Sequence, residues 1–200
     1  MAVSAVRVET VSAVLDAAES LLIEDGHRGV TTRRLAERAA VNHGLIHYYF
    51  GSIEEVLLQT LERFTARLTA RQRDFYTAEI PFIEKWRTAM RYLTEDSESG
   101  YEKIWFELQA VGWNNAKVRT RVAAVFAEWL SILTPAFDAG LDELGIDKAR
   151  WPTEAVVALV MTFNEGIMVE MLSGFDCGHG SLLMLVDELL EGAHERTIGT

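Results

Sequence analysis

The stretch that decides the fold is residues 30–50, which read VTTRRLAERAAVNHGLIHYYF. Two short helical patterns lie in it, one following Thr31 and Thr32 and one over residues 43–50, and Ala40–Val41–Asn42 breaks the pattern between them. Threonine is a favoured residue at a helix N-terminus. Two short helices joined by a tight turn are typical of a helix-turn-helix, whose second helix enters the DNA major groove.

The second of these helices has two different edges. Ile46 and Tyr49 form an apolar edge, which would pack on the neighbouring helices. The opposite edge carries groups able to meet phosphates or base edges, namely Asn42, His43, Leu45, His47 and Tyr48. An amphipathic pattern over residues 9–24, stopped by Gly26, predicts a third helix that supports the pair.

Helical periodicity continues through the rest of the chain, and no strand-like alternation of useful length occurs. Ser52 and Glu55 form a capping-box pair that opens a long helix toward residue 74. Pro135 is expected to kink or divide another long helix, because proline loses a helix hydrogen bond. The remaining helices are expected over 81–97, 101–113, 118–144, 152–172 and 181–194. The prediction is an all-α fold of about nine helices.

Composition and charge exclude several classes of protein. Of 200 residues, 49% are apolar and 24% charged, which is an ordinary globular balance. The single cysteine excludes an intramolecular disulfide, which fits a reducing cytoplasm. The charge-free stretches are about half the length of a membrane span, so we expect a cytoplasmic protein with no membrane partner. The net charge of −11 argues against nucleic acid, but residues 1–50 carry only −1 of it.

Over roughly residues 9–60 the chain resembles the tetracycline-repressor (TetR) family of bacterial transcription factors. The resemblance is carried by residues 14–62, which read VLDAAESLLIEDGHRGVTTRRLAERAAVNHGLIHYYFGSIEEVLLQTLE. An alanine-rich helix ends at a glycine, a threonine pair precedes LAERA, and a short helix ends in tyrosine and phenylalanine. The resemblance implies a homodimer of all-helical subunits. We expect a helix-turn-helix DNA-binding domain over residues 1–52 and a ligand-binding and dimerisation domain over residues 53–200.

The resemblance also implies contacts with double-stranded DNA. The threonine pair would touch phosphate, Arg33 would reach a base or a phosphate, and Gly44 would let the backbone approach DNA closely. Arg34 and Arg38 are left open between phosphate contact and solvent. The expected DNA-binding set is Thr31, Thr32, Arg33, Asn42, His43, Gly44, Leu45, His47, Tyr48 and Tyr49.

Three residues depart from the family pattern. Ala40 stands where a glycine with positive φ is usual, so keeping that conformation would cost about 1 kcal/mol. Gly51 replaces a common proline. Ile53 replaces a common lysine, which removes one phosphate contact per subunit and predicts a shallower salt dependence of DNA binding.

The C-terminal part is rich in aromatic and apolar residues. Seven aromatic residues lie within 101–137, and they form either a core or a pocket for a mainly apolar or aromatic effector. The pocket residues that we expect are Trp105, Glu107, Gln109, Trp129, Phe163, Asn164 and Met168.

The helix over 153–172 is apolar nearly all round, so it must be covered on every side, and a second subunit is the expected cover. The expected dimer interface is Val156, Val160, Phe163, Ile167, Met171, Leu182, Leu185, Val186 and Leu189.

No catalytic or cofactor motif is found, so neither an enzyme nor a cofactor nor a metal site is predicted. His43 and His47 have zinc-pair spacing but lack the metalloprotease glutamate, since Gly44 follows the first histidine. The segment Asp176–Cys177–Gly178–His179 could hold a soft metal or sense oxidation, but a mobile loop is the favoured interpretation.

The predicted function is a ligand-responsive regulator. It would bind a palindromic operator as a homodimeric repressor and release it when a mainly apolar small molecule binds the C-terminal domain. The alternative is a helical small-molecule-binding or enzymatic protein whose N-terminal domain no longer binds DNA. The acidic charge, Ala40 and Ile53 support that alternative.

Overall fold

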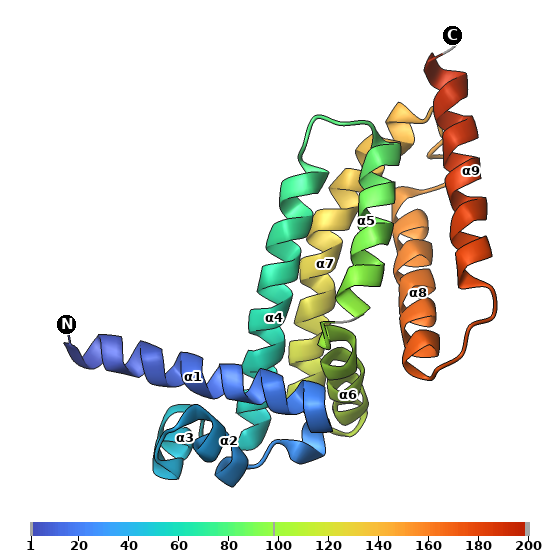
Figure 1. The fold of residues 1–200 in the computed structure, drawn as a ribbon. Coiled ribbons are helices and arrows are strands. Elements are labelled where there is room, and N and C mark those ends of the chain that lie inside the picture. The colour runs from blue at the N-terminus through green and yellow to red at the C-terminus, as the bar shows by residue number, and fades with distance from the viewer. Residues whose placement is uncertain (1, 98, 199–200) are drawn as a thin grey trace. The chain divides into compact units, whose positions relative to one another are not determined.

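The structure, a computed structural model, describes residues 2–97 and 99–198. Within these ranges it is built from nine α-helices and one short 3-10 turn, without a strand (Figure 1). The all-α prediction is confirmed. The elements are α1 (Ala2–Asp25), η1 (His27–Gly29), α2 (Thr32–Ala39), α3 (His43–Phe50), α4 (Ile53–Tyr76), α5 (Phe82–Ser97), α6 (Tyr101–Asn114), α7 (Ala116–Glu143), α8 (Thr153–Leu172) and α9 (His179–Ile198).

The chain forms two compact units. The first contains residues 1–67 and 99–125, and the second contains residues 68–98 and 126–200. Helices α4 and α7 therefore contribute residues to both units. The functional division expected at residue 52 is a different kind of boundary and stays a prediction.

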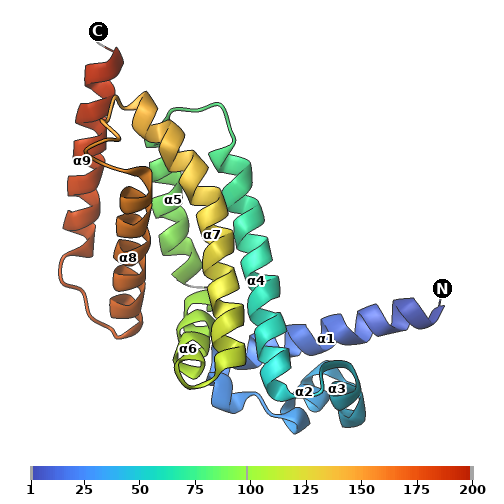
Figure 2. The same ribbon diagram turned by 180° about the vertical axis from the view of Figure 1, so that it is seen from behind.

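The first unit is organised around the inner face of α1. Val14, Ala18, Leu21 and Leu22 on this helix are almost fully buried, as their three- and four-residue spacing predicts. Helix α2 packs on α1 and on α3 (Figure 2). Helix α6 also contacts α1. This packing fixes the helix-turn-helix from behind.

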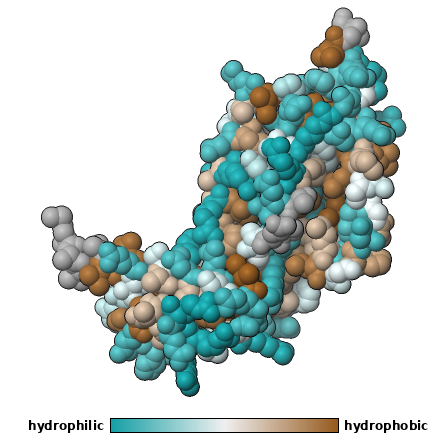
Figure 3. All heavy atoms as spheres, in the orientation of Figure 1, coloured by the Kyte–Doolittle hydropathy of each residue, from teal (hydrophilic) through white to brown (hydrophobic). Residues whose placement is uncertain are grey.

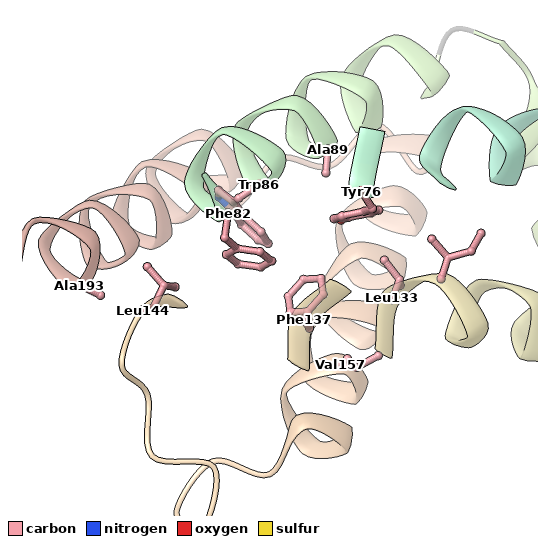
Figure 4. Packing of buried hydrophobic residues seen from close by; sticks show 10 residues of the cluster. Tyr76, Phe82, Trp86, Ala89, Leu133, Phe137, Leu144, Val157 and Ala193 are labelled. Carbon is pink, nitrogen blue, oxygen red and sulfur yellow. The ribbon is translucent and has the colours of Figure 1, made fainter. Parts of the chain in front are cut away.

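The second unit is built around a cluster of aromatic side chains from α4, α5 and α7 (Figure 4). The rings of Phe82 and Phe137 meet edge to face, with their centroids 5.1 Å apart. Gly140 lies under this contact, because a Cβ there would stand 2.3 Å from the ring of Phe82. Helices α8 and α9 close the cluster with Val157 and Ala193.

Helix α7 is not divided at Pro135, which lies inside it. Of the kink or division expected at Pro135, the division is wrong, and the kink stays a prediction. Pro135 and Ser131, whose carbonyl loses its partner, both lie on the exposed face, where solvent can replace the missing hydrogen bond. On the opposite face Leu133, Phe137 and residues one turn further on are buried, so both halves of the helix pack into the core.

Candidate DNA-binding site

Helix α2 begins and ends with well-defined caps. Thr31 is its N-cap, and its hydroxyl accepts a hydrogen bond from the amide of Arg34 at 3.3 Å. Ala40 ends it in the left-handed region, at φ 54°, as the only non-glycine residue with positive φ in the described chain. The amide of Val41 then donates to the carbonyl of Ala36 at 3.0 Å, which completes a Schellman-type end. The strained conformation expected at Ala40 is confirmed.

Helix α3 is held at both ends and along one edge. Asn42 is its N-cap and accepts from the amide of Gly44 at 2.9 Å. Ile46 and Phe50 are buried and fasten the helix to the unit. Gly51 ends it at φ 75°, a backbone conformation closed to the proline usual at this position.

The opposite edge of α3 faces solvent. His43, Gly44 and His47 are exposed, and Leu45 and Tyr48 are 36% and 78% exposed. Such exposure of large apolar and aromatic groups on a short helix leaves them available to base edges and phosphates.

Tyr49 lies at the border between the exposed and buried edges of α3. It is half-buried, and its ring meets that of Tyr48 edge to face at 5.0 Å. The guanidinium of Arg7 lies 6.0 Å from the Tyr49 ring centroid, which brings a positive charge from α1 to this edge. This contact could not be predicted from sequence spacing, because Arg7 lies 42 positions before Tyr49.

Two arginines of α2 are paired with acids of α1. Arg38 makes two hydrogen bonds of 2.8 Å to the carboxylate of Glu24, and the pKa of Glu24 is lowered by this pairing. Arg34 makes one hydrogen bond to the carboxylate of Asp25. Both arginines therefore support the α1–α2 contact and are not simply solvated.

Arg33 is held more weakly than its neighbours. It pairs with Glu37 within its own helix at 2.8 Å, and its side chain is 88% exposed. Solvent screens an exposed ion pair of this kind, so a DNA phosphate can replace it. Thr32 at the start of α2 is half-buried beside it.

The seven expected ligand-binding residues are distributed over the two units. The first unit holds Trp105, which is buried, and Glu107 and Gln109, which are half-buried. The second unit holds Trp129, Phe163, Asn164 and Met168, all half-buried. They therefore form no single cavity inside one unit. Trp105 stacks on Tyr101 at 6.5 Å and belongs to the core of its unit.

Each unit contains a cavity of moderate size. The first, of about 420 Å³, is lined by residues of η1 and α6, and Glu107 is the one expected residue among them. Glu107 accepts a hydrogen bond from the backbone amide of His27, and its carboxylate lies 3.3 Å from His27 Nδ1. The second, of about 360 Å³, lies between α5 and α9 and includes Trp86, Met90 and Leu183.

Helices α8 and α9 run side by side and carry an apolar surface (Figures 1 and 3). Of the expected interface residues, Leu182, Leu185 and Leu189 are 40%, 52% and 65% exposed. Met171 is exposed too, and Val156, Val160, Phe163 and Val186 are half-buried. Ile167 is 4% exposed and packs within its own chain, so it is unavailable to a partner.

Two helices, α7 and α8, are long and apolar enough to cross a membrane by length and composition alone. Core helices of soluble proteins pass the same test. Glu154, Glu165 and Glu170 lie along α8, and carboxylates are costly to place in hydrocarbon. The apolar face of α8 is therefore weak evidence for a membrane.

The fold and the exposed edge of α3 define a helix-turn-helix protein of the all-helical class. Residues 14–60 match the model of the bacterial regulatory proteins of the tetR family. The match falls in the region whose sequence resembles that family.

One curated protein shares part of this sequence. The HTH-type transcriptional repressor Rv3405c of Mycobacterium tuberculosis is 35% identical over 63 residues, which is 32% of this chain and 34% of that protein. The match thus spans about a third of the length of this curated relative.

Two solved structures share the fold over nearly the whole chain. FadR from Bacillus subtilis, in complex with stearoyl-CoA, aligns with a TM-score of 0.73 at 17% identity, over 90% of this chain and 96% of that one. A transcriptional regulator from Saccharomonospora viridis, in complex with choline, aligns with a TM-score of 0.69 at 16% identity, over 94% and 96%.

Proposed function

We propose that this protein is a homodimeric transcriptional repressor that binds a palindromic operator and releases it when a small molecule binds the C-terminal helices. The observation that carries the proposal is the geometry of α3. Its buried edge is fastened by Ile46 and Phe50, while Tyr48 and both histidines project from the unit. A helix held in this way can enter the major groove without rearrangement.

The composition of the exposed edge supports DNA as the partner. The side chains of His43, His47 and Tyr48 can donate hydrogen bonds to phosphates or base acceptors, and Leu45 offers an apolar contact for a thymine methyl group. Thr31 and Thr32 stand at the start of α2, where backbone amides favour a phosphate. These residues, with Arg33, Asn42, Gly44 and Tyr49, form the proposed DNA-binding surface.

Homodimerisation is supported by the leucines that α8 and α9 leave exposed. A two-fold dimer would cover the same surface on both subunits. It would also present two copies of α3 to successive major grooves, about 34–36 Å apart or a multiple of this distance. A palindromic operator follows from this symmetry.

An effector site in the C-terminal helices is supported by the stearoyl-CoA and choline complexes of the two structural neighbours. In this chain Asn164 Oδ1 on α8 is buried without a hydrogen-bond partner among the described residues, next to the half-buried Phe163. A buried acceptor of this kind favours a ligand that carries a donor on an otherwise apolar body. Because linkage is reciprocal, the effector must bind the DNA-free state more tightly.

The test is selection of genomic DNA fragments by the purified protein at fixed moderate salt, followed by sequencing. We expect a palindromic site upstream of a few genes. Tyr48→Ala should lower the affinity for that site by about ten-fold or more, consistent with a base or phosphate contact. Trp151→Ala removes another exposed aromatic residue, 52% exposed and far along the chain, and should leave the affinity unchanged.

Absence of enrichment from a protein that is folded, dimeric and stripped of bound ligand would contradict the proposal. It would favour a helical small-molecule-binding protein without DNA function.

Repression is tested separately, with a reporter gene behind the selected site. Deletion of the protein should raise expression of that reporter, and a fall would indicate an activator.

A further inference from the structure

The connection between α8 and α9 brings together three side chains of the kinds that bind metal ions. Glu170 comes from the last turns of α8, Cys177 from the loop, and His179 from the start of α9. One potential ligand atom of each lies within 4.8 Å of the other two. None of the three belongs to the proposed DNA-binding surface.

The distances between these atoms are close to those of a tetrahedral site. Cys177 Sγ lies 3.4 Å from Glu170 Oε2 and 3.8 Å from His179 Nε2. Metal–ligand bonds of about 2.0–2.3 Å at tetrahedral angles give edges of about 3.3–3.6 Å. The third edge, between Glu170 Oε2 and His179 Nε2, is a 2.6 Å hydrogen bond, which a cation would replace by opening it less than about 1 Å.

Neighbouring groups already orient the histidine. Asp176 Oδ1 accepts from the amides of Gly178 at 2.8 Å and of His179 at 3.1 Å, which fixes the loop against the start of α9. The same oxygen lies 3.7 Å from His179 Nδ1. Metal-binding histidines usually donate a hydrogen bond from their second nitrogen to a carboxylate. The Asp176 carboxylate lies beside this nitrogen, at ion-pair distance rather than hydrogen-bond distance.

Burial also fits a metal site. The side chain of His179 is 10% exposed and that of Glu170 is 41% exposed, while Cys177 is exposed. The nitrogen ligand is thus held by packing, and a cation has a path to the thiol from solvent.

We propose that Glu170, Cys177 and His179 bind a single divalent cation of the zinc type. One sulfur, one nitrogen and one oxygen ligand suit zinc or cobalt, whereas calcium and magnesium prefer oxygen alone. On binding, the Cys177 thiol releases its proton to solvent, and the His179 proton moves from Nε2 to Nδ1, toward Asp176. Three protein ligands leave the fourth tetrahedral position to water.

Cobalt(II) is the probe for the test, added to the reduced full-length protein after a thiol assay confirms one free thiol per chain. We expect one equivalent to bind, with the visible absorption of tetrahedral cobalt and a thiolate-to-cobalt charge-transfer band. Zinc should displace it. Cys177→Ser should abolish the charge-transfer band, and Glu170→Gln and His179→Gln should each lower the affinity by at least ten-fold.

Two further variants separate the site from general effects. Asp176→Asn should weaken cobalt binding by about 10–100-fold because it perturbs the histidine orientation. Glu195→Gln changes an exposed carboxylate on α9, the helix that carries His179. This variant should bind cobalt as tightly as the parent does. Absence of a charge-transfer band in the parent, or equal cobalt affinity in the parent and Cys177→Ser, would overturn the proposal. Circular dichroism of each variant keeps loss of folding apart from loss of a ligand.

Discussion

Ala40 shows how one residue can carry the strain of a functional turn. It takes a left-handed conformation at φ 54°, ψ 39° between α2 and α3. This conformation costs an L-residue about 1–2 kcal/mol, which glycine avoids. The Schellman-type hydrogen bonds offset this strain, and so does the burial of Leu35 and Ile46 on either side of the turn. The angle between α2 and α3, and with it the exposure of the α3 edge, rests on this residue.

Ala40→Gly should raise the free energy of unfolding by about 0.5 kcal/mol, because relief of the left-handed strain exceeds the added entropy of the unfolded chain. Ala39→Gly, one residue earlier in α2, is the matched control and should lower it by about 0.5–1 kcal/mol. Urea denaturation of both variants gives the two values. A shift of the same sign for both would show that residue 40 is not strained.

At the scale of the element, the start of α4 follows the capping-box pattern of the sequence only in part. Ser52 caps α4, since its hydroxyl accepts from the amide of Glu55 at 3.1 Å, as the capping-box pattern predicts. The carboxylate of Glu55, however, turns to Gln59 and to Lys117 and Arg121 near the start of α7. The reciprocal half of the capping box is thus replaced by contacts between helices.

The Glu55 carboxylate predicts a pH-dependent stability. Partial burial raises its pKa, but the hydrogen bonds from Gln59, Lys117 and Arg121 outweigh this effect and lower the pKa from 4.5 to about 2. Because the folded-state pKa is the lower one, the unfolded chain binds more protons in acid. The stabilisation is therefore present above about pH 4.5 and is lost as the pH falls toward 2.

Glu55→Gln should accordingly lower the unfolding free energy by about 1–2 kcal/mol at pH 7. The difference from the parent should shrink between pH 4.5 and pH 2, where the parent carboxylate takes up its proton. Denaturation curves at a series of pH values provide the measurement. A constant difference across that range would contradict the assigned pKa.

Pro135 provides a second prediction at this scale. Replacing it by alanine in Pro135→Ala should restore the missing hydrogen bond in α7 and raise the unfolding free energy by about 1–3 kcal/mol. Ala139→Pro, at an exposed position one turn later, should lower it by about 3 kcal/mol or more. Thermal unfolding followed by circular dichroism tests both. If Pro135→Ala is neutral or destabilising, then α7 is adapted to the proline by a local distortion.

At the scale of the whole molecule, the exposed apolar surface of α8 and α9 is the feature that an isolated chain leaves unexplained. Large exposed apolar patches mark interfaces in soluble proteins. The leucines are spaced at 182, 185 and 189 along α9, the three- and four-residue repeat of one helical stripe. A single stripe with this repeat fits the same helix of a second copy across a two-fold axis.

Leu185→Glu should convert the proposed dimer into a monomer, because each subunit would bury a charge in the proposed interface. Sedimentation equilibrium measures the change. Ile80→Glu is the control, since Ile80 is an apolar residue, 41% exposed, in the connection between α4 and α5. A parent protein that is already monomeric, or a dimer unaffected by Leu185→Glu, would remove this surface from the assembly.

The sequence by itself determined the bounds of α2 and α3, the helix-turn-helix and the unusual residue in its turn. The helices α2 and α3 begin and end within a residue or so of the predicted positions because caps and apolar periodicity are local signals. The strain at Ala40 followed from the residue type that such a turn requires.

Only the tertiary structure decided which groups from distant parts of the chain meet. It pairs Arg38 with Glu24 and Glu55 with Arg121, and it keeps α7 whole through Pro135. These outcomes depend on side-chain packing between helices, to which sequence spacing gives no access. An apolar stripe has the same sequence pattern whether it packs inside one chain or against a second subunit. The packing between helices therefore decides which of the two covers a given helix face.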